Sequence, residues 1–98
     1  MILEISPRFF GEALNQEQAV RKALRKMLPM LERMSFVELT RHKGLHLEKL
    51  TGMVYPDTGE PLYSVRVTLA ARALCIVRQD TLMLTSFHPG HDQAYRKH

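Results

Sequence analysis

The chain has 98 residues, 45% of them hydrophobic and 24% charged. This length predicts a single domain spanning residues 1–98, and the globular composition excludes a wholly disordered chain. The formal net charge of +4 favours an anionic partner such as nucleic acid. No apolar run approaches the roughly 20 residues that cross a bilayer, and the first residues lack the basic-then-apolar order of a secretion signal. We therefore expect a cytoplasmic protein, in which the single cysteine, Cys75, is a core residue.

The first third of the chain has the pattern of a strand followed by two helices. Apolar residues within 1–5 predict a short strand, and Ser6 followed by Pro7 predicts the start of a helix. Residues 15–18 carry a second capping signal, after which apolar residues recur at three- and four-residue spacing. Pro29 is expected to kink the second helix or to split off its last turn.

The remainder of the chain has the alternation and β-branched residues typical of strands. Four strands are expected, over residues 45–50, 62–68, 71–77 and 81–87. Pro56, Asp57 and Gly59 predict a turn between the first two of them. The sequence therefore predicts an α+β fold, in which an N-terminal strand and a two-helix hairpin pack on an antiparallel sheet of about four to five strands.

Basic residues outnumber acidic ones between residues 21 and 49. We predict that these cations, together with two near the C-terminus, contact the phosphates of RNA or the ribosome, whereas the alternative is a merely solvated basic surface. The residues predicted to bind RNA or the ribosome are Arg21, Lys22, Arg25, Lys26, Lys43, Lys49, Arg96 and Lys97.

Two arginines flank a tight turn between two of the expected strands. Pairing of these strands would bring the guanidinium groups of Arg66 and Arg72 together, where an anion such as phosphate would bridge them. The alternative is that each arginine pairs with a carboxylate such as Glu48 or Glu60. The side chain of Glu48 is accordingly either a salt-bridge partner or a general base.

The C-terminal segment is rich in groups that exchange protons near neutral pH. His88, His91, Asp92 and Tyr95 lie within eight residues of one another, a density typical of general acid–base chemistry. We favour His91 as the acid because Asp92 could orient its ring. The alternative is a zinc site formed by His88, His91 and Asp92, which Pro89-Gly90 disfavours by preventing a regular helix.

Three motifs in chain order resemble the RelE/ParE superfamily of bacterial toxin–antitoxin toxins. They are GLHLEKLTG at 44–52, LYSVRV at 62–67 followed by ARAL at 71–74, and HPGHDQAY at 88–95. Two departures are Ala71, where the family commonly has an aromatic residue, and Pro89-Gly90, which lengthens the spacing to His91.

The resemblance implies a toxin that cuts mRNA on the ribosome through attack of the 2′-OH on the adjacent phosphate, with no metal or other cofactor. The residues implied for catalysis are Glu48, Arg66, Arg72, His88, His91 and Tyr95. Glu48 would be the base, the two arginines would stabilise the phosphorane, and the acid would come from the C-terminal segment. The resemblance also implies an acidic, partly disordered antitoxin as partner. The alternatives are a ParE-like inhibitor of DNA gyrase and a noncatalytic RNA- or protein-binding module.

Overall fold

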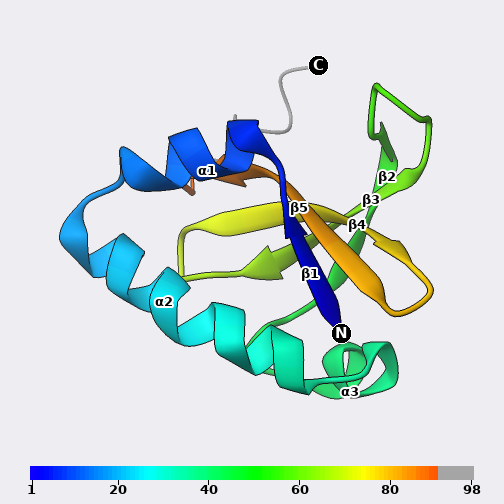
Figure 1. Ribbon diagram of the computed structural model, residues 1–98, viewed down its shortest axis with the longest axis horizontal. Coiled ribbons are helices and arrows are strands. Elements are labelled where there is room, and N and C mark those ends of the chain that lie inside the picture. The colour runs from blue at the N-terminus through cyan, green and yellow to red at the C-terminus, as the bar shows by residue number, and fades with distance from the viewer. Residues whose placement is uncertain (91–98) are drawn as a thin grey trace.

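A five-stranded sheet with strand order β1-β5-β4-β3-β2 forms the centre of the computed structural model, which describes residues 1–90 (Figure 1). In chain order the elements are β1 (Ile2–Ile5), α1 (Pro7–Leu14), α2 (Gln18–Arg33), α3 (Phe36–Arg41), β2 (Glu48–Val54), β3 (Pro61–Arg66), β4 (Arg72–Arg78) and β5 (Thr81–His88). The predicted α+β fold class is confirmed.

The sheet is mixed, because β1 pairs in parallel with β5 while the other neighbouring strands are antiparallel. The expectation of an antiparallel sheet is confirmed for β2 to β5 and is wrong for β1, whose pairing is parallel. A parallel partner needs a long crossover connection, which the chain between β1 and β5 provides. In the resulting register Ile2 lies opposite Thr81 and Ile5 lies opposite Leu84.

The two helices of the hairpin differ in how closely they follow the expected capping signals. Helix α1 begins at Pro7, and the backbone N–H of Phe9 donates to Ser6 Oγ over 3.1 Å, as expected of an N-cap. Helix α2 has Glu17 as its N-cap residue, whereas Asn15 ends α1. Helix α2 is not split at Pro29 but continues to Arg33. Pro29 is exposed, so water can satisfy the carbonyl that proline leaves without a donor.

Helix α3 is an element that the sequence analysis missed. Ser35 and Glu38 form a reciprocal capping box, in which Ser35 Oγ accepts from the Glu38 N–H and the Glu38 carboxylate accepts from the Ser35 N–H. The Ser-x-x-Glu signal was present in the sequence and predicts such a start. Helix α3 buries Leu39 completely.

Strand β2 begins later in the chain than expected. A strand was expected over residues 45–50, but β2 starts only at Glu48. The residues before it form a loop, in which His46 has a left-handed φ of 46°. The strand then passes through Gly52, whose φ of +78° accompanies a shift of register against β3. The other expected strands agree with the structure to within one or two residues.

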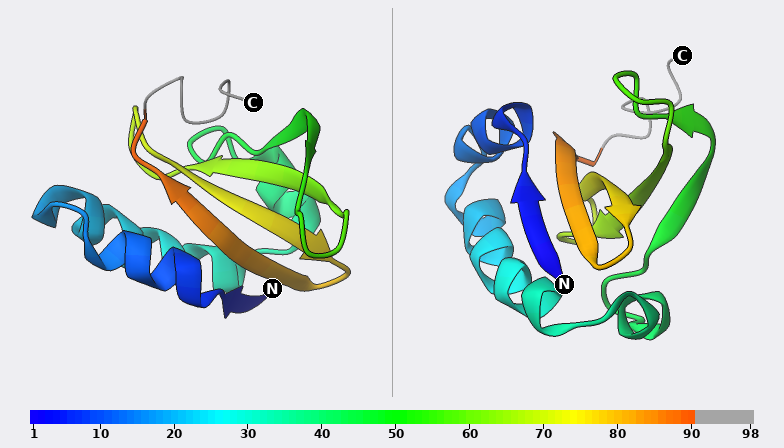
Figure 2. Two further views of the ribbon diagram at one scale, coloured as in Figure 1. Left: turned by 90° about the horizontal axis from the view of Figure 1, so that it is seen from above. Right: turned by 45° about the vertical axis from the view of Figure 1, so that its right-hand side comes forward.

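Most of the apolar side chains pack between the helices and one face of the sheet. This core contains Phe9, Leu24, Met27, Leu31, Leu39, Leu45, Val65, Ala71, Ala73, Cys75, Leu82, Leu84 and Phe87. A smaller cluster of Leu62, Leu74 and Ile76 lies on the opposite face, because neighbouring residues of a strand point to opposite sides. We call this second face the open face, since α1 and α2 run along the other side of the sheet (Figure 2). Within residues 1–90, no helix has the length and apolar character that crossing a membrane requires.

Burial makes Cys75 a reporter of folding. Its side chain is fully buried in the main core, as expected, and burial raises the pKa of its thiol to about 12. We predict that a thiol-specific reagent at pH 8 modifies the folded protein far more slowly than the urea-unfolded protein, because the folded thiol neither ionises nor meets solvent. Rapid stoichiometric modification of the folded protein, followed by absorbance, would contradict this burial.

Candidate functional site

The register of β3, β4 and β5 places three of the predicted catalytic residues in one row. Arg66 lies opposite Arg72, and Arg72 lies opposite His88. Residues that are directly opposite one another share a face of the sheet, and Arg72 alternates with the buried Ala73, so the row lies on the open face. On the neighbouring strand, Glu48 lies opposite Ser64.

The guanidinium group of Arg72 is held in place by three neighbouring residues. Its Nη2 donates to Ser64 Oγ over 2.6 Å and to the carbonyl oxygen of His46 over 2.9 Å. The same nitrogen lies 3.3 Å from Glu48 Oε1. The Arg72 side chain is only 12% exposed, whereas that of Glu48 is 56% exposed. A largely buried cation is therefore fixed at the centre of the row, with a carboxylate at its solvent side.

Two donors of the same row have no acceptor within the described part of the chain. The Nε atoms of Arg66 and Arg72 are both buried and unpaired there. An unsatisfied buried donor typically costs about 1–3 kcal/mol, and two neighbouring cations also repel each other. An oxyanion would offset both costs, since guanidinium groups match phosphate oxygens.

The two carboxylates that could have paired with Arg66 or Arg72 have different partners in the structure. Arg72 contacts Glu48, but Glu60 pairs with Arg78, whose Nη2 lies 2.6 Å from Glu60 Oε1. Hydrogen bonds from Arg78 and, to a lesser extent, from Thr58 lower the pKa of Glu60 to about 2. The alternative in which Glu60 neutralises one of the paired arginines is therefore wrong, because the strand register places Glu60 near the far end of β4.

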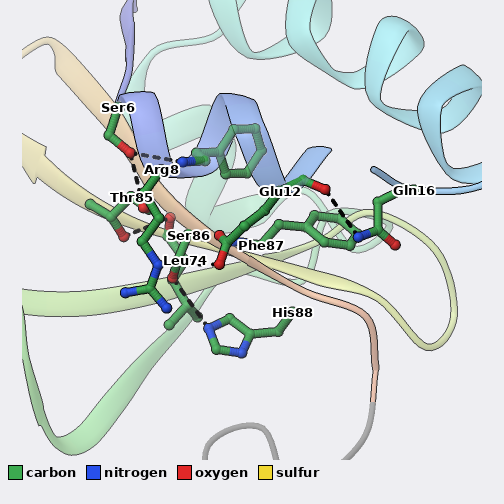
Figure 3. A network of polar contacts seen from close by, with 10 residues as sticks. Ser6, Arg8, Glu12, Gln16, Leu74, Thr85, Ser86, Phe87 and His88 are labelled. Atoms are coloured by element: carbon green, nitrogen blue, oxygen red, sulfur yellow. Dashed lines mark hydrogen bonds and ion pairs between the residues drawn. The ribbon is translucent and has the colours of Figure 1, made fainter. Parts of the chain in front are cut away.

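His88 ends β5 in a network that anchors this strand to α1 (Figure 3). Its Nε2 lies 3.2 Å from the hydroxyl of the buried Ser86. The backbone N–H of Phe87 donates to Glu12 Oε1 over 2.8 Å, and the other oxygen of Glu12 accepts from Arg8 Nε over 3.1 Å. Helix α1 thus fixes the backbone immediately before His88.

The C-terminal end of the described chain passes close to the turn between β3 and β4. Gly90 has a φ of +106°, and a Cβ atom at this position would collide with the backbone of Ala70. Only glycine combines this conformation with so close an approach. Gly90 therefore lies beside the turn that Arg66 and Arg72 flank.

The predicted phosphate-binding residues do not share one surface. Arg21, Lys22, Arg25 and Lys26 lie on α2, so that the sheet separates them from the row on the open face. Lys49 lies opposite Tyr63 and so points to the other face of β2 from Glu48, and Lys43 lies in the loop before β2. This division was not predictable from local patterns, because it depends on which face of the sheet the helices cover.

Several predicted residues fall outside the described residues, namely His91, Asp92, Tyr95, Arg96 and Lys97. The zinc hypothesis uses two of them. Within residues 1–90, no three His, Cys, Asp or Glu side chains are grouped as a metal site would require.

Two residues of the site were not selected as site residues in the sequence analysis. Ser64 belongs to the motif at 62–67, but only its register opposite Glu48 and its hydrogen bond with Arg72 reveal its role. His46 lies in the motif at 44–52 but was assigned no role there, because its left-handed backbone and its contact with Arg72 are visible only in the structure.

Comparison with known proteins identifies the fold. No protein-family profile matches the chain, and no curated protein matches its sequence. The archaeal RelE–RelB complex from Pyrococcus horikoshii OT3 contains a chain with a TM-score of 0.65 and 18% identity, with 90% of this chain and 92% of that chain covered. A copper-bound mutant toxin from Helicobacter pylori gives a TM-score of 0.54 at 13% identity, covering 97% of this chain and 98% of that one. The YoeB dimer from Staphylococcus aureus gives a TM-score of 0.53 at 16% identity, covering 88% of this chain and 92% of that chain. The chain therefore has the fold of RelE-type toxins, so the resemblance expected from the sequence is confirmed in its architecture.

The unpaired arginines generate a prediction about anion binding. We expect inorganic phosphate to raise the melting temperature relative to chloride at equal ionic strength, with a gain of about 1.4 kcal/mol at a concentration tenfold above Kd. The Arg66→Gln variant should lose this gain, because one of the two bridging cations is removed.

The matched control is Arg78→Gln, since Arg78 is exposed and is already bound to Glu60. An equal stabilisation of the wild-type and Arg66→Gln proteins in differential scanning calorimetry would show that phosphate binds elsewhere.

Proposed function

We propose that this chain is the toxin of a type II toxin–antitoxin pair and that it cleaves ribosome-bound mRNA through attack of the 2′-OH on the adjacent phosphate. The observation that carries this proposal is the row of Arg66, Arg72 and His88 on the open face, with Glu48 beside it. The RelE-like fold supports the same assignment.

The row supplies the kinds of group that this reaction needs. In the reaction a bond forms between the 2′-oxygen and phosphorus while the bond from phosphorus to the 5′-oxygen breaks. Arg66 and Arg72 are suited to stabilise the additional negative charge of the phosphorane. A base must take the proton of the 2′-OH, and an acid must protonate the 5′-oxygen.

The two ends of the row are suited to these opposite proton transfers. Glu48 lies on β2 and His88 lies on β5, so β3 and β4 separate the two residues. Neighbouring strands are about 4.8 Å apart, so a nucleotide phosphate bound at Arg72 would have one group on each side. We assign removal of the 2′-OH proton to the end of the row at Glu48, which we call the base end. Protonation of the 5′-oxygen is assigned to the end at His88, the acid end, with His91 and Tyr95 as further candidates for the acid.

The first test removes the central cation. We expect Arg72→Ala to reduce cleavage of ribosome-bound mRNA by about 10²–10³-fold, because it loses charge stabilisation of the transition state. Cleavage is measured by mapping new 5′ ends in a purified translation reaction, and circular dichroism checks the fold.

The control for this test is Arg78→Ala, which removes an exposed arginine of the same strand that pairs with Glu60 and lies outside the row. Supercoiling by DNA gyrase is measured in parallel. Inhibition of gyrase without mRNA cleavage would replace the nuclease proposal with the ParE-like alternative, and inactivity in both assays would favour a binding module.

The partner that we infer is an acidic antitoxin, and the groove between α1 and α2 is the surface that fits it. This groove is lined by Ile5, Phe9, Phe10, Ala13, Leu14, Arg21, Leu24, Arg25 and Leu28. Phe10 and Leu14 are 58% and 57% exposed, which leaves large apolar side chains in contact with water. The arginines in its wall complement a segment that combines apolar anchors with carboxylates.

The exposed Lys22 and Lys26, with Lys43 and Lys49, remain our candidates for ribosome contact.

This assignment predicts that substitutions in the groove weaken antitoxin binding without changing mRNA cleavage. We expect Phe10→Ser and Leu14→Ser each to weaken binding of the protein encoded beside this gene by about tenfold or more, because each variant loses apolar burial. Both variants should cleave mRNA normally. Isothermal titration calorimetry measures the binding, with Val37→Ser as the control, since Val37 is 55% exposed on a different helix. Unchanged affinity in both groove variants would place the antitoxin elsewhere.

A further inference from the structure

His46 adopts a backbone conformation that is uncommon for a residue other than glycine. Its φ of 46° lies in the left-handed region, which costs an ordinary residue about 1–2 kcal/mol. Two hydrogen bonds hold the conformation: the His46 N–H donates to the carbonyl of His42 over 3.1 Å, and the His46 carbonyl accepts from Arg72 Nη2 over 2.9 Å. The second bond ties this loop directly to the central cation of the row.

The imidazole ring of His46 lies at the solvent side of the same cluster. Its Nε2 is 3.9 Å from Glu48 Oε1, and the two side chains are 50% and 56% exposed. Two charged groups therefore flank this residue, namely the Glu48 carboxylate from β2 and the Arg72 guanidinium from β4. The ring is thus accessible to a substrate and adjacent to a carboxylate.

We propose that His46 is the base of the cleavage reaction and that Glu48 is its positioning partner. This inference rests on the proposed nuclease function and specifies which atom takes the proton. As the 2′-oxygen bonds to phosphorus, its proton passes to His46 Nε2, and the bond to the 5′-oxygen breaks as that oxygen takes a proton from the acid end. The products are a 2′,3′-cyclic phosphate and a 5′-hydroxyl, and His46 returns its proton to water.

The geometry favours His46 over Glu48 as the proton acceptor because Glu48 already serves Arg72. Protonation of Glu48 would weaken its ion pair with Arg72 at the moment when negative charge develops on the phosphate. Protonation of His46 leaves this ion pair intact and adds a second favourable contact, between the imidazolium and Glu48. The separation of 3.9 Å is longer than a hydrogen bond, as is common for catalytic pairs before the substrate binds.

The competing explanation is that His46 only closes the turn that leads into β2. Glycine and asparagine separate the two explanations, because both tolerate a positive φ while neither provides an imidazole. We expect His46→Gly and His46→Asn to retain or raise the melting temperature and to lower the single-turnover cleavage rate on ribosome-bound mRNA by about 10²–10⁴-fold. Added imidazole should restore part of the activity of His46→Gly.

The pH profile and the double variant provide further readouts. An imidazole titrates about two pH units above a carboxylate, and a base acts when deprotonated. The acid limb of activity should therefore move to lower pH in His46→Asn, where Glu48 is the base that remains. Because Glu48 is the base that remains, the His46→Gly, Glu48→Gln double variant should be slower than His46→Gly alone and should lose the shifted acid limb.

His42→Asn is the matched control, because His42 lies before the same loop and its Nδ1 accepts from the Leu45 N–H. This variant should lower the melting temperature without moving the acid limb. Wild-type rates in His46→Gly and His46→Asn would overturn the role of His46 while leaving the nuclease proposal intact. Absence of cleavage by the wild-type protein would overturn both.

Discussion

The site is organised around one guanidinium group that the fold holds almost completely out of solvent. Arg72 is bound by the Ser64 hydroxyl, by the His46 carbonyl and by the Glu48 carboxylate, which come from β3, from the loop before β2 and from β2 itself. These contacts bring side chains of two further strands and the loop before β2 onto one charged group, in addition to the hydrogen bonds of the sheet. A buried charge needs such partners to be tolerated, so the position of Arg72 determines where the carboxylate and the neighbouring loop must lie.

The elements of the fold were predictable wherever a cap, an apolar periodicity or an alternation within the element itself indicates them. The Ser6-Pro7 cap, the apolar periodicity of α2 and the alternation in the last three strands each predicted the element that the structure contains. The parallel partner of β1 was not predictable in this way, because strand pairing depends on contacts between the two ends of the chain. Helix α3 was missed although its capping box was present, since six residues are too few to show a periodic apolar face.

The candidate site was only partly accessible from the sequence. The tight turn predicted that Arg66 and Arg72 lie opposite each other, and this pairing is confirmed. The row extends to His88 because β5 pairs with β4, a register that no local pattern reveals. Ser64 and His46 contribute through a hydroxyl and a backbone carbonyl. These groups carry no residue-type signature of phosphate chemistry, so sequence reasoning passed over them.

The two faces of the sheet have a consequence for how such a protein can diversify. The groove between α1 and α2 and the row on the open face share no residue in the described part of the chain. Under the functions proposed for them, substitutions that change the choice of partner leave the reacting groups untouched. A duplicated gene could therefore drift away from its original antitoxin and acquire a new one while it remained lethal throughout. The architecture would let the residues that recognise the antitoxin change rapidly while the reacting groups on the open face change slowly.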